Sequence, residues 1–569
     1  MKVLLLSLFH PELVRGGAQQ ICYELFEGLQ ARDDAEPVLL AAIEPRFAAL
    51  YKSGARITGF DKRPNEYVFL SRDYDYLWHK ATNPLLIDSF AEFLETVKPD
   101  VVHFHHFLLF GMNLLTVTRK VLPHAKIVFT FHEFLTICHA NGQMLRRNDN
   151  ALCTRASNVR CHQCFPELGP DFFFMRELWM KRHLGVVDVF TCPSRFMIEH
   201  FVTWGLPREK IRYVTNGQRD YSGGSGLQDV RAKRNRFGFF GQLVDNKGVW
   251  VILRAVEQLR AEGFTDFIVE INGDNLRYAS EERRKEVEDF LAAEKERPFS
   301  EQIVFFNGSY HVDELPQRMR RIDWCMVPST WWEIFGLVIS EAWMFGRPVI
   351  ASNVGGPKER IRHDVDGLLF AVGDSRSLAD TMRRACTEEG IWDRLAEGVR
   401  LAPSREVMVD GYRAVYAEPP AAIASRPTPA RAPVVPAARP VPIPVPPPAP
   451  AEPSEFDPET FLAQLSPRVE PVRYTQPPPA PAPEPFIEIG FEAIVAFEAA
   501  PVAVPPPPEQ PPAPSAAAAE TSESPSADPD TAPAPSAPDI AETNPPMAAA
   551  EAKAALSSPR GKSQRRKKR

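Results

Sequence analysis

Short apolar runs alternate with longer amphipathic segments along the first 418 residues of the chain. Runs of this length between helical patterns are typical of parallel strands in βαβ units. The alternation pauses at a turn-rich, charged stretch (217–236) and then starts again. We therefore predict an α/β fold with two successive Rossmann-like, parallel-sheet domains. The predicted strands are VLLLSLF, PVLLAAI, DVVHFHHF, KIVFTFHEF, DVFTCPS and IRYVTNG in the first domain, and FGFFGQL, DFIVEINGD, QIVFFNGSY, DWCMVPS and RPVIASN in the second.

The composition changes sharply near residue 417. Of the 56 prolines, 39 fall between Pro419 and Arg569, where Ala, Ser and Glu are also frequent. Such a segment cannot bury enough apolar surface to offset its chain entropy. We expect a first domain at 1–217, a second at 218–416 that ends in the helix SREVMVDGYRAVYA, and a disordered tail at 417–569 with a basic end. Ligands of parallel sheets bind at the carboxyl ends of the strands, so a ligand is expected between two domains that face each other across a cleft.

Charge and hydrophobic patterning exclude some classes of protein. The formal net charge of -7 argues against a nucleic-acid binder. The apolar run after Lys2 is short and lacks a cleavage site, so it predicts a buried strand and not a signal peptide. No run is long enough for a spanning helix. We expect a cytoplasmic protein, and the basic RRKKR end could place it peripherally at the inner face of the membrane.

Two glutamates lie eight residues apart in an otherwise apolar stretch, TWWEIFGLVISEAWMFGRPVIASNVGG. The pattern predicts a helix from about Phe335 to Phe345, with Glu333 at its start and Glu341 in its middle. An acid at a helix start can simply favour the dipole, and an arginine could be the structural partner of Glu341. Alternatively, the free N–H groups of Phe335, Gly336 and Leu337 could bind a pyrophosphate. The two carboxylates would then contact the ribose and the sugar of a nucleotide-diphosphate-sugar.

The same stretch resembles the donor site of the retaining family-4 glycosyltransferases of the GT-B fold (glycosyl transferases group 1). The resemblance covers about residues 1–416, and its motifs occur in the family's order. They are GGAQ at Gly16, TFHEF around His132, PSRF at Pro193, TNG at Thr215, NKG at Asn246, the E-x7-E pair, GRPVIASNVGG and GLLF at Gly367.

The resemblance implies a role for each matching residue. Glu341 resembles the ribose-binding glutamate, Glu333 the one that contacts the donor sugar, and Lys247 the lysine that neutralises the diphosphate. The N-terminal loop that approaches the phosphates corresponds to Gly16 and Gly17, and His132 resembles the active-site histidine, although it could be a core histidine at a strand end. The implied catalytic residues are Glu333, His132 and Lys247. The implied donor-binding residues are Gly16, Gly17, Gln242, Lys247, Phe335, Gly336, Leu337 and Glu341.

Gln242 departs from the family pattern, which usually has arginine there. Glutamine has neither the charge nor the bidentate fork of arginine. Donor affinity could be lower, another cation could substitute, or the chain could be a non-catalytic relative.

Four of the eight cysteines cluster in a C-x14-C-x7-C-x2-C pattern. Cys138, Cys153, Cys161 and Cys164 could supply four thiolates to a structural zinc ion in an insertion at 138–164. In a chain without an export signal, a cysteine cluster is more typical of a metal site than of disulfides. The alternative is four free cysteines in a loop.

The leading hypothesis is a retaining hexosyltransferase. It would use a UDP- or GDP-sugar and a saccharide or lipid-linked acceptor, in the synthesis of a surface or exported polysaccharide, and the resemblance implies no cofactor for catalysis. Two alternatives remain open, a sugar-nucleotide epimerase of the same fold and an inactive scaffold that acts through its tail.

Overall fold

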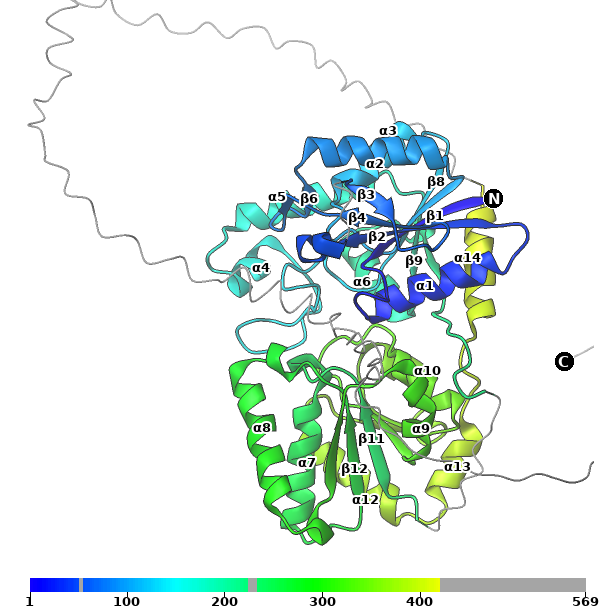
Figure 1. Ribbon diagram of the computed structural model, residues 1–569. Coiled ribbons are helices and arrows are strands. Elements are labelled where there is room, and N and C mark those ends of the chain that lie inside the picture. Colours follow the sequence, from blue (N-terminus) through cyan, green and yellow to red (C-terminus); the bar gives the residue numbers. More distant parts are fainter. Residues whose placement is uncertain (51–54, 224–232, 420–569) are drawn as a thin grey trace, which may run out of the picture. The chain divides into compact units, whose positions relative to one another are not determined.

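The computed structural model describes residues 1–50, 55–223 and 233–419, with the side chains of 48–50 left out. Within these residues the chain forms two separate, mainly parallel sheets (Figure 1). The predicted α/β class with two parallel-sheet domains is confirmed. The predicted disordered tail falls on residues 420–569, and most of the predicted linker falls on 224–232, so both lie outside the described residues.

The first sheet has eight strands in the order β10-β9-β8-β7-β1-β2-β4-β3, and only β3 runs antiparallel to its neighbour. Its strands are β1 (Lys2–Leu8), β2 (Glu36–Ile43), β3 (Ile57–Gly59), β4 (Glu66–Leu70), β7 (Val101–Phe104), β8 (Lys126–Thr130), β9 (Val189–Cys192) and β10 (Ile211–Tyr213). A small hairpin, β5 (Tyr74–Asp75) and β6 (Lys80–Ala81), lies outside the sheet. The helices of this half are α1 (Gly17–Gln30), α2 (Pro84–Val97), α3 (Asn113–Val121), α4 (Asn158–Cys164), α5 (Pro170–Leu184) and α6 (Arg195–Trp204).

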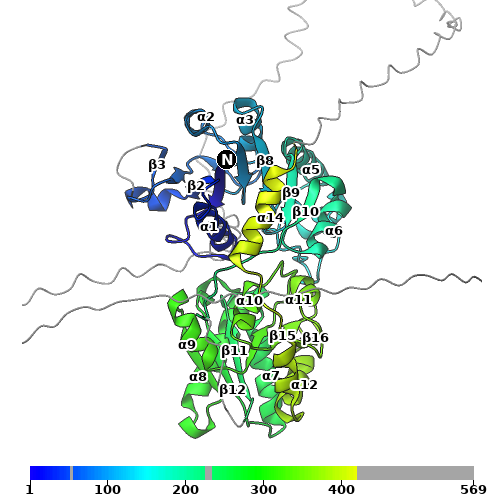
Figure 2. The same ribbon diagram turned by 90° about the vertical axis from the view of Figure 1, so that its right-hand side faces the viewer.

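The two faces of the first sheet pack against different helices. Because side chains alternate along a strand, Leu4 and Leu6 of β1 belong to a core with α2, α3, α5 and α6, whereas Val3 and Leu5 belong to a core with α1 and α14 (Arg405–Ala417). Figure 2 shows α14 beside α1. The last helix, assigned by the sequence to the second domain, thus packs on the first.

The second sheet has six parallel strands in the order β13-β12-β11-β14-β15-β16. Its strands are β11 (Arg236–Phe240), β12 (Ile268–Asn272), β13 (Val304–Gly308), β14 (Trp324–Val327), β15 (Val349–Ser352) and β16 (Gly367–Phe370). Its helices are α7 (Val249–Ala261), α8 (Glu281–Glu296), α9 (Leu315–Arg320), α10 (Leu337–Met344), α11 (Gly355–Arg360), α12 (Ser375–Thr387) and α13 (Ile391–Gly398).

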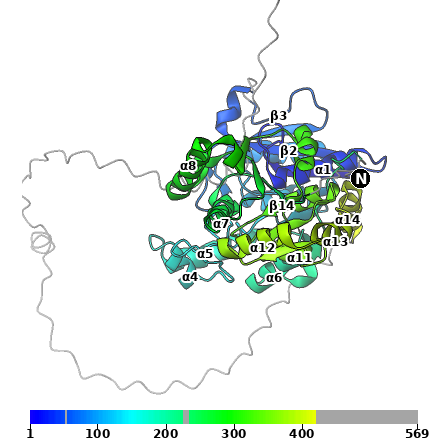
Figure 3. The same ribbon diagram turned by 90° about the horizontal axis from the view of Figure 1, so that it is seen from below.

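The side chains of the second sheet also alternate between two cores, one on each face of the sheet. Trp324 and Met326 of β14 face the core under α7, α8, α12 and α13, and α7 and α12 lie side by side in Figure 3. Cys325 and Val327 face the core under α9 and α10. None of the helices in the described parts of the chain is both long and apolar enough to cross a membrane.

Candidate active site

One cavity of about 410 Å³ is lined by loops that follow strands of both sheets. All the residues that the sequence assigned to catalysis or donor binding line this cavity. They are Gly16, Gly17, His132, Gln242, Lys247, Phe335, Gly336 and Leu337, together with Glu333 and Glu341. The strand ends bring together segments that are more than 300 residues apart in the chain.

Glu333 is buried in the loop between β14 and α10, and one of its carboxylate oxygens accepts three hydrogen bonds. Its Oε2 lies 2.8 Å from Lys247 Nζ, 3.0 Å from Ser329 Oγ and 3.1 Å from Trp331 Nε1. Burial alone would raise the pKa of Glu333, but the charge of Lys247 and these hydrogen bonds outweigh burial and lower the pKa below its usual value. Glu333 is therefore a buried anion with a paired cation.

Lys247 reaches Glu333 from a 3₁₀ turn, Asp245–Lys247, that follows β11. Gly248 ends this turn with φ +73°, and a Cβ there would lie 2.0 Å from the carbonyl oxygen of Pro328. Only glycine allows this left-handed backbone to approach the β14 loop so closely. The NKG motif thus places the Lys247 ammonium beside Glu333, 5.4 Å from the ring centroid of Trp331.

Glu341 is also buried, but its partner is an amide. Gln218 Nε2 donates to Glu341 Oε1 at 3.2 Å, so the arginine that the sequence allowed as a structural partner is replaced by Gln218, the first residue after the TNG motif. Burial raises the pKa of Glu341 to about 7, and the bond from Gln218 opposes this rise. A neutral donor compensates less for lost hydration than the ammonium beside Glu333 does.

Helix α10, which contains Glu341, is shorter than predicted. It runs from Leu337 to Met344 instead of Phe335 to Phe345, because Gly336 has φ +73° and breaks the helical backbone. Phe335 and Gly336 precede the helix, and Arg360 holds their carbonyls with bonds of 3.1 and 2.8 Å. Glu333 therefore lies in the loop before α10 and not at the start of the helix, whereas Glu341 lies within the helix as predicted.

Two glycines of the GRPVIASNVGG motif support the Glu333 loop. A Cβ on Gly355, whose φ is +55°, would lie 2.4 Å from the Glu333 carbonyl oxygen, and Gly356 N donates to that oxygen at 2.7 Å. From the first half, Gly17 lies beside the start of α10, where a Cβ would make an ordinary van der Waals contact of 3.4 Å with Leu337 Cδ1. The contacts of Gly355 and Gly356 explain why the motif needs glycine where it lies against the loop.

Comparison with known proteins assigns both halves to one family. Residues 15–218 match the model described as Glycosyltransferase Family 4, and residues 234–388 match the model described as Glycosyl transferases group 1. The chain belongs to the group 1, family-4 glycosyltransferases.

Individual relatives agree with this family. The D-inositol 3-phosphate glycosyltransferase of Salinispora arenicola is 38% identical over 113 residues, or 19% of this chain and 25% of that protein. The glycogen synthase of Mycobacterium tuberculosis is 23% identical over 416 residues, or 70% of this chain and 89% of that protein. For several curated relatives, the Salinispora protein among them, the chain spans half of their length or less.

A solved structure shares the fold. Anabaena HepE in complex with UDP and glucose superposes with a TM-score of 0.51 at 18% identity, covering 74% of this chain and all of that one. This likeness confirms the predicted GT-B fold.

In this family member, His132 lies just after β8 and contacts another histidine. His132 Nε2 lies 3.0 Å from His105 Nδ1, and burial lowers the pKa of His132 to about 4, which keeps the ring neutral near pH 7. The neighbouring Glu133 also lines the cavity, where burial raises its pKa to about 8. His106, which follows β7, lies 3.7 Å from Glu133.

Sequence reasoning missed several residues of this site. Gln218 was read as the start of a linker, yet it is buried and bonded to Glu341. Asn141 and Gln143 line the cavity from inside the cysteine-rich segment. Asn141 and Gln143 carry no signal in an isolated sequence, whereas the TNGQ string that includes Gln218 continues a family motif and could have been used.

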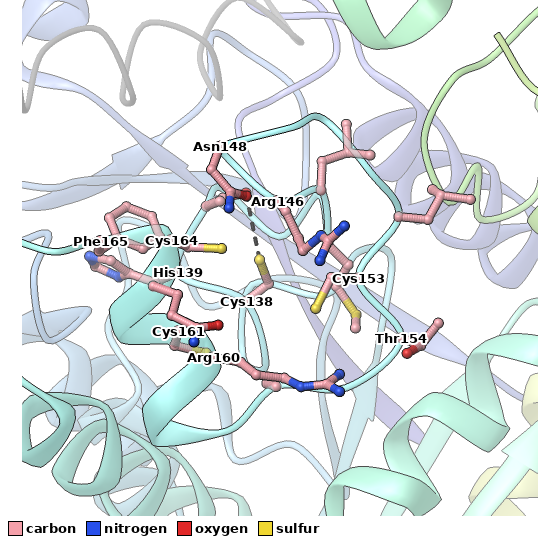
Figure 4. Close-up of a pocket in the computed structure, with 16 residues that line it drawn as sticks. Cys138, His139, Arg146, Asn148, Cys153, Thr154, Arg160, Cys161, Cys164 and Phe165 are labelled. Atoms are coloured by element: carbon pink, nitrogen blue, oxygen red, sulfur yellow. Dashed lines mark hydrogen bonds between the residues drawn. The ribbon is translucent and has the colours of Figure 1, made fainter.

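The four clustered cysteines line a second cavity of about 360 Å³ (Figure 4). All four are free thiols and half-buried. Among the residues that the structure describes, no group of three or more His, Cys, Asp or Glu side chains lies close enough to hold a metal ion. The structure thus brings Cys138, Cys153, Cys161 and Cys164 to one cavity, and the zinc hypothesis stays a prediction.

Proposed function

We propose that this protein transfers a hexose from a UDP- or GDP-sugar to a saccharide or lipid-linked acceptor with retention of anomeric configuration. The synthesis of a surface or exported polysaccharide is the proposed context. The observation that carries the proposal is the joint presence, in one cavity, of Glu333 bonded to Lys247 and of the buried Glu341. The complex of Anabaena HepE with UDP and glucose supports a nucleotide-sugar donor.

The proposed donor lies along the loop and helix between the two glutamates. Glu341 accepts hydrogen bonds from the ribose hydroxyls, which replace part of its lost hydration. The diphosphate lies at the start of α10, where Leu337 and Val338 precede the first hydrogen bond of the helix, from Ile339 N to the Gly336 carbonyl. Gly16 and Gly17 line the same cavity.

Chemistry in this proposal is mainly electrostatic. Lys247 neutralises the charge that develops on the departing diphosphate, and Glu333 orients the sugar through its hydroxyls. The acceptor approaches on the face from which the diphosphate leaves. The ammonium of Lys247 supplies the positive charge, and we propose that transfer needs no added divalent ion.

Arg15 supports the alternative in which another cation substitutes for the arginine that is missing at position 242. Its side chain lines the cavity and lies 3.0 Å from His311 Nε2, so a second cation is present although Gln242 is neutral. We propose that Arg15 contributes to phosphate binding. Arginine can make bidentate contacts with phosphate, which glutamine cannot.

Peripheral membrane contact is proposed for delivery of a lipid-linked acceptor. On α5, Phe174, Met175 and Leu178 are about half exposed, and exposed apolar clusters often mark interaction sites. Co-sedimentation with anionic vesicles tests this contact, and replacing all three residues with serine should abolish it.

Transfer is tested by incubating the full chain with UDP- and GDP-hexoses, alone and with saccharide or lipid-linked acceptors. We expect acceptor-dependent release of the nucleoside diphosphate, and the anomeric proton coupling of the product should show retention. Glu333→Gln should lower the rate of transfer strongly, by about 10²- to 10³-fold. Glu294→Gln should not, because Glu294 is buried and ion-paired to Arg260 but does not line the cavity.

Two outcomes would contradict the proposal. Interconversion of nucleotide-sugars without any acceptor would indicate an epimerase. Tight nucleotide binding without turnover in any combination would indicate an inactive scaffold.

A further inference from the structure

The second cavity is built almost entirely by the segment between β8 and α5. Cys138 precedes a pair of turns, Cys153 follows the bridge between Leu145 and Leu152, and Cys161 and Cys164 lie one turn apart on α4. The remaining four cysteines do not line it. Four soft ligands, from three separate stretches of chain, thus surround one space of about 360 Å³.

Hydrophobic packing holds the two parts of this segment unequally, because Met144 is buried in the core of the first half whereas α4 is not. Helix α4 has only seven residues, and none of them is buried. Helices this short are unstable without tertiary stabilisation. The cysteine side chains therefore lie where the fold needs an additional source of stability.

The charges around the cavity match a tetrathiolate metal centre. Zn²⁺ with four thiolates carries a net charge of about -2, counted from its ligands. Arg160 lines the cavity, as does Arg146, which is also ion-paired to Asp149. Arg176 is 3% exposed and donates to the carbonyls of Thr136 and Ile137 at 3.0 and 3.4 Å. A buried guanidinium is costly without a nearby negative charge.

We propose that Cys138, Cys153, Cys161 and Cys164 bind one structural Zn²⁺ ion as thiolates. A tetrahedral site with Zn–S bonds of about 2.3 Å brings the four sulfurs within roughly 3.8 Å of one another. The described side chains are not at that spacing, so binding includes rotation of the cysteines into the cavity. Each thiol releases its proton as the metal binds, and no redox step is involved.

The ion would also position part of the active-site wall. Asn141 and Gln143, between the first two cysteines, line the candidate active site. From the other half, Trp332 Nε1 donates to the Cys153 carbonyl at 3.0 Å, and Trp332 directly precedes Glu333. Loss of the ion would loosen both contacts without removing any residue that binds the donor.

Metal analysis of the full chain, purified without added metal or chelator, tests the site. We expect about one zinc per chain in the wild type and less than a tenth of that in Cys161→Ala/Cys164→Ala. Cys386→Ala is the control, because Cys386 is half-buried on α12 and outside the cavity, and it should keep the full zinc content.

A second measurement does not depend on how well the variant folds. Wild-type protein stripped of zinc with a thiol reagent and a strong chelator should show faster proteolysis within 138–164, and reloading with Co²⁺ should give the visible bands of a tetrahedral thiolate site. Zinc-free wild type with four titrating thiols, or with disulfides among these cysteines, would overturn the proposal. Full zinc retention in the double variant would do so as well.

Discussion

Glu333 and Glu341 belong to one short stretch of sequence, yet the fold places them in opposite electrostatic environments. In the loop before α10, Glu333 accepts a hydrogen bond from the Lys247 ammonium. The charge of Lys247 and the hydrogen bonds to Glu333 outweigh burial and lower the pKa of Glu333. On α10, Glu341 accepts a hydrogen bond from the Gln218 amide, and burial raises the pKa of Glu341 to about 7. Equal burial therefore does not set the charge of a side chain, because the chemistry of the partner decides it.

The largest effect is expected at the ionised carboxylate. Glu333→Gln should lower kcat by about 10²- to 10³-fold, the range seen when one preorganised polar group is lost from a transition-state site. Steady-state kinetics with the donor and acceptor identified by the transfer screen measure it. A kcat within threefold of wild type would show that Glu333 does not act on the sugar.

Lys247→Met should lower kcat about 100-fold and also destabilise the fold. It leaves the Glu333 carboxylate buried without its cation, which costs about 3 kcal/mol when one partner of a buried pair is removed. Urea unfolding measures the loss. In Lys247→Met/Glu333→Gln, which removes both charges, most of the lost stability should return; equal stability of the single and double variants would contradict the pairing.

At Glu341 we expect a pH dependence. If only the carboxylate binds the ribose hydroxyls, a pKa of about 7 raises the competent fraction from about a tenth at pH 6 to about nine tenths at pH 8, and the apparent Kd of the nucleotide-sugar falls about tenfold. The folded pKa of Glu341 lies above its usual value, so its contribution to stability is present at low pH and is lost as the pH rises through about 7.

Calorimetry with the nucleotide-sugar measures this dependence, because that ligand has no phosphate group that titrates near pH 7. Glu341→Gln should remove the dependence. Glu133→Gln is the matched control, since Glu133 lines the same cavity with a pKa raised by burial to about 8, and it should leave the dependence in place. If the pH dependence disappears in Glu133→Gln and persists in Glu341→Gln, the titrating group is Glu133 and the prediction for Glu341 is wrong.

The smallest effect is expected from Gln242→Arg. It adds a charge-assisted contact to the diphosphate and should tighten nucleoside diphosphate binding by about tenfold or less, because Arg15 already lines the cavity. Arg15→Ala should weaken binding in the wild type and have less effect in the Gln242→Arg background. Equal effects of Arg15→Ala in both backgrounds would show that the two positions act independently.

The sequence predicted which residues surround the cavity better than it predicted their partners. Motifs identify Glu333 and Lys247 because each occurs in a short local string, but their hydrogen bond joins residues 86 positions apart. Gln218 lies in a polar stretch of sequence that gives no sign of burial. Its side chain is buried because it contacts Glu341 on α10, which is distant in the sequence. These partners follow from tertiary packing, which a local pattern does not encode.

The start of α10 and the place of α14 were mispredicted for related reasons. The positive φ of Gly336 overrides the helical pattern of the residues around it. The amphipathic pattern of α14 shows that one face is buried, but not against which sheet. The packing of Tyr412 and Tyr416 in the core of the first sheet, with Tyr416 OH 2.7 Å from His103 Nδ1, places α14 there.

The most direct test compares the Kd of the nucleoside diphosphate with that of the nucleotide-sugar, by calorimetry at pH 8, in wild type, Glu333→Gln and Glu341→Gln. We predict that Glu341→Gln weakens both ligands by the same factor, because it contacts the ribose that they share. Glu333→Gln should weaken only the nucleotide-sugar, because it contacts the sugar. Loss of nucleoside diphosphate binding in Glu333→Gln, or unchanged binding of both ligands in Glu341→Gln, would contradict the assignment of the two glutamates to the two ends of one donor.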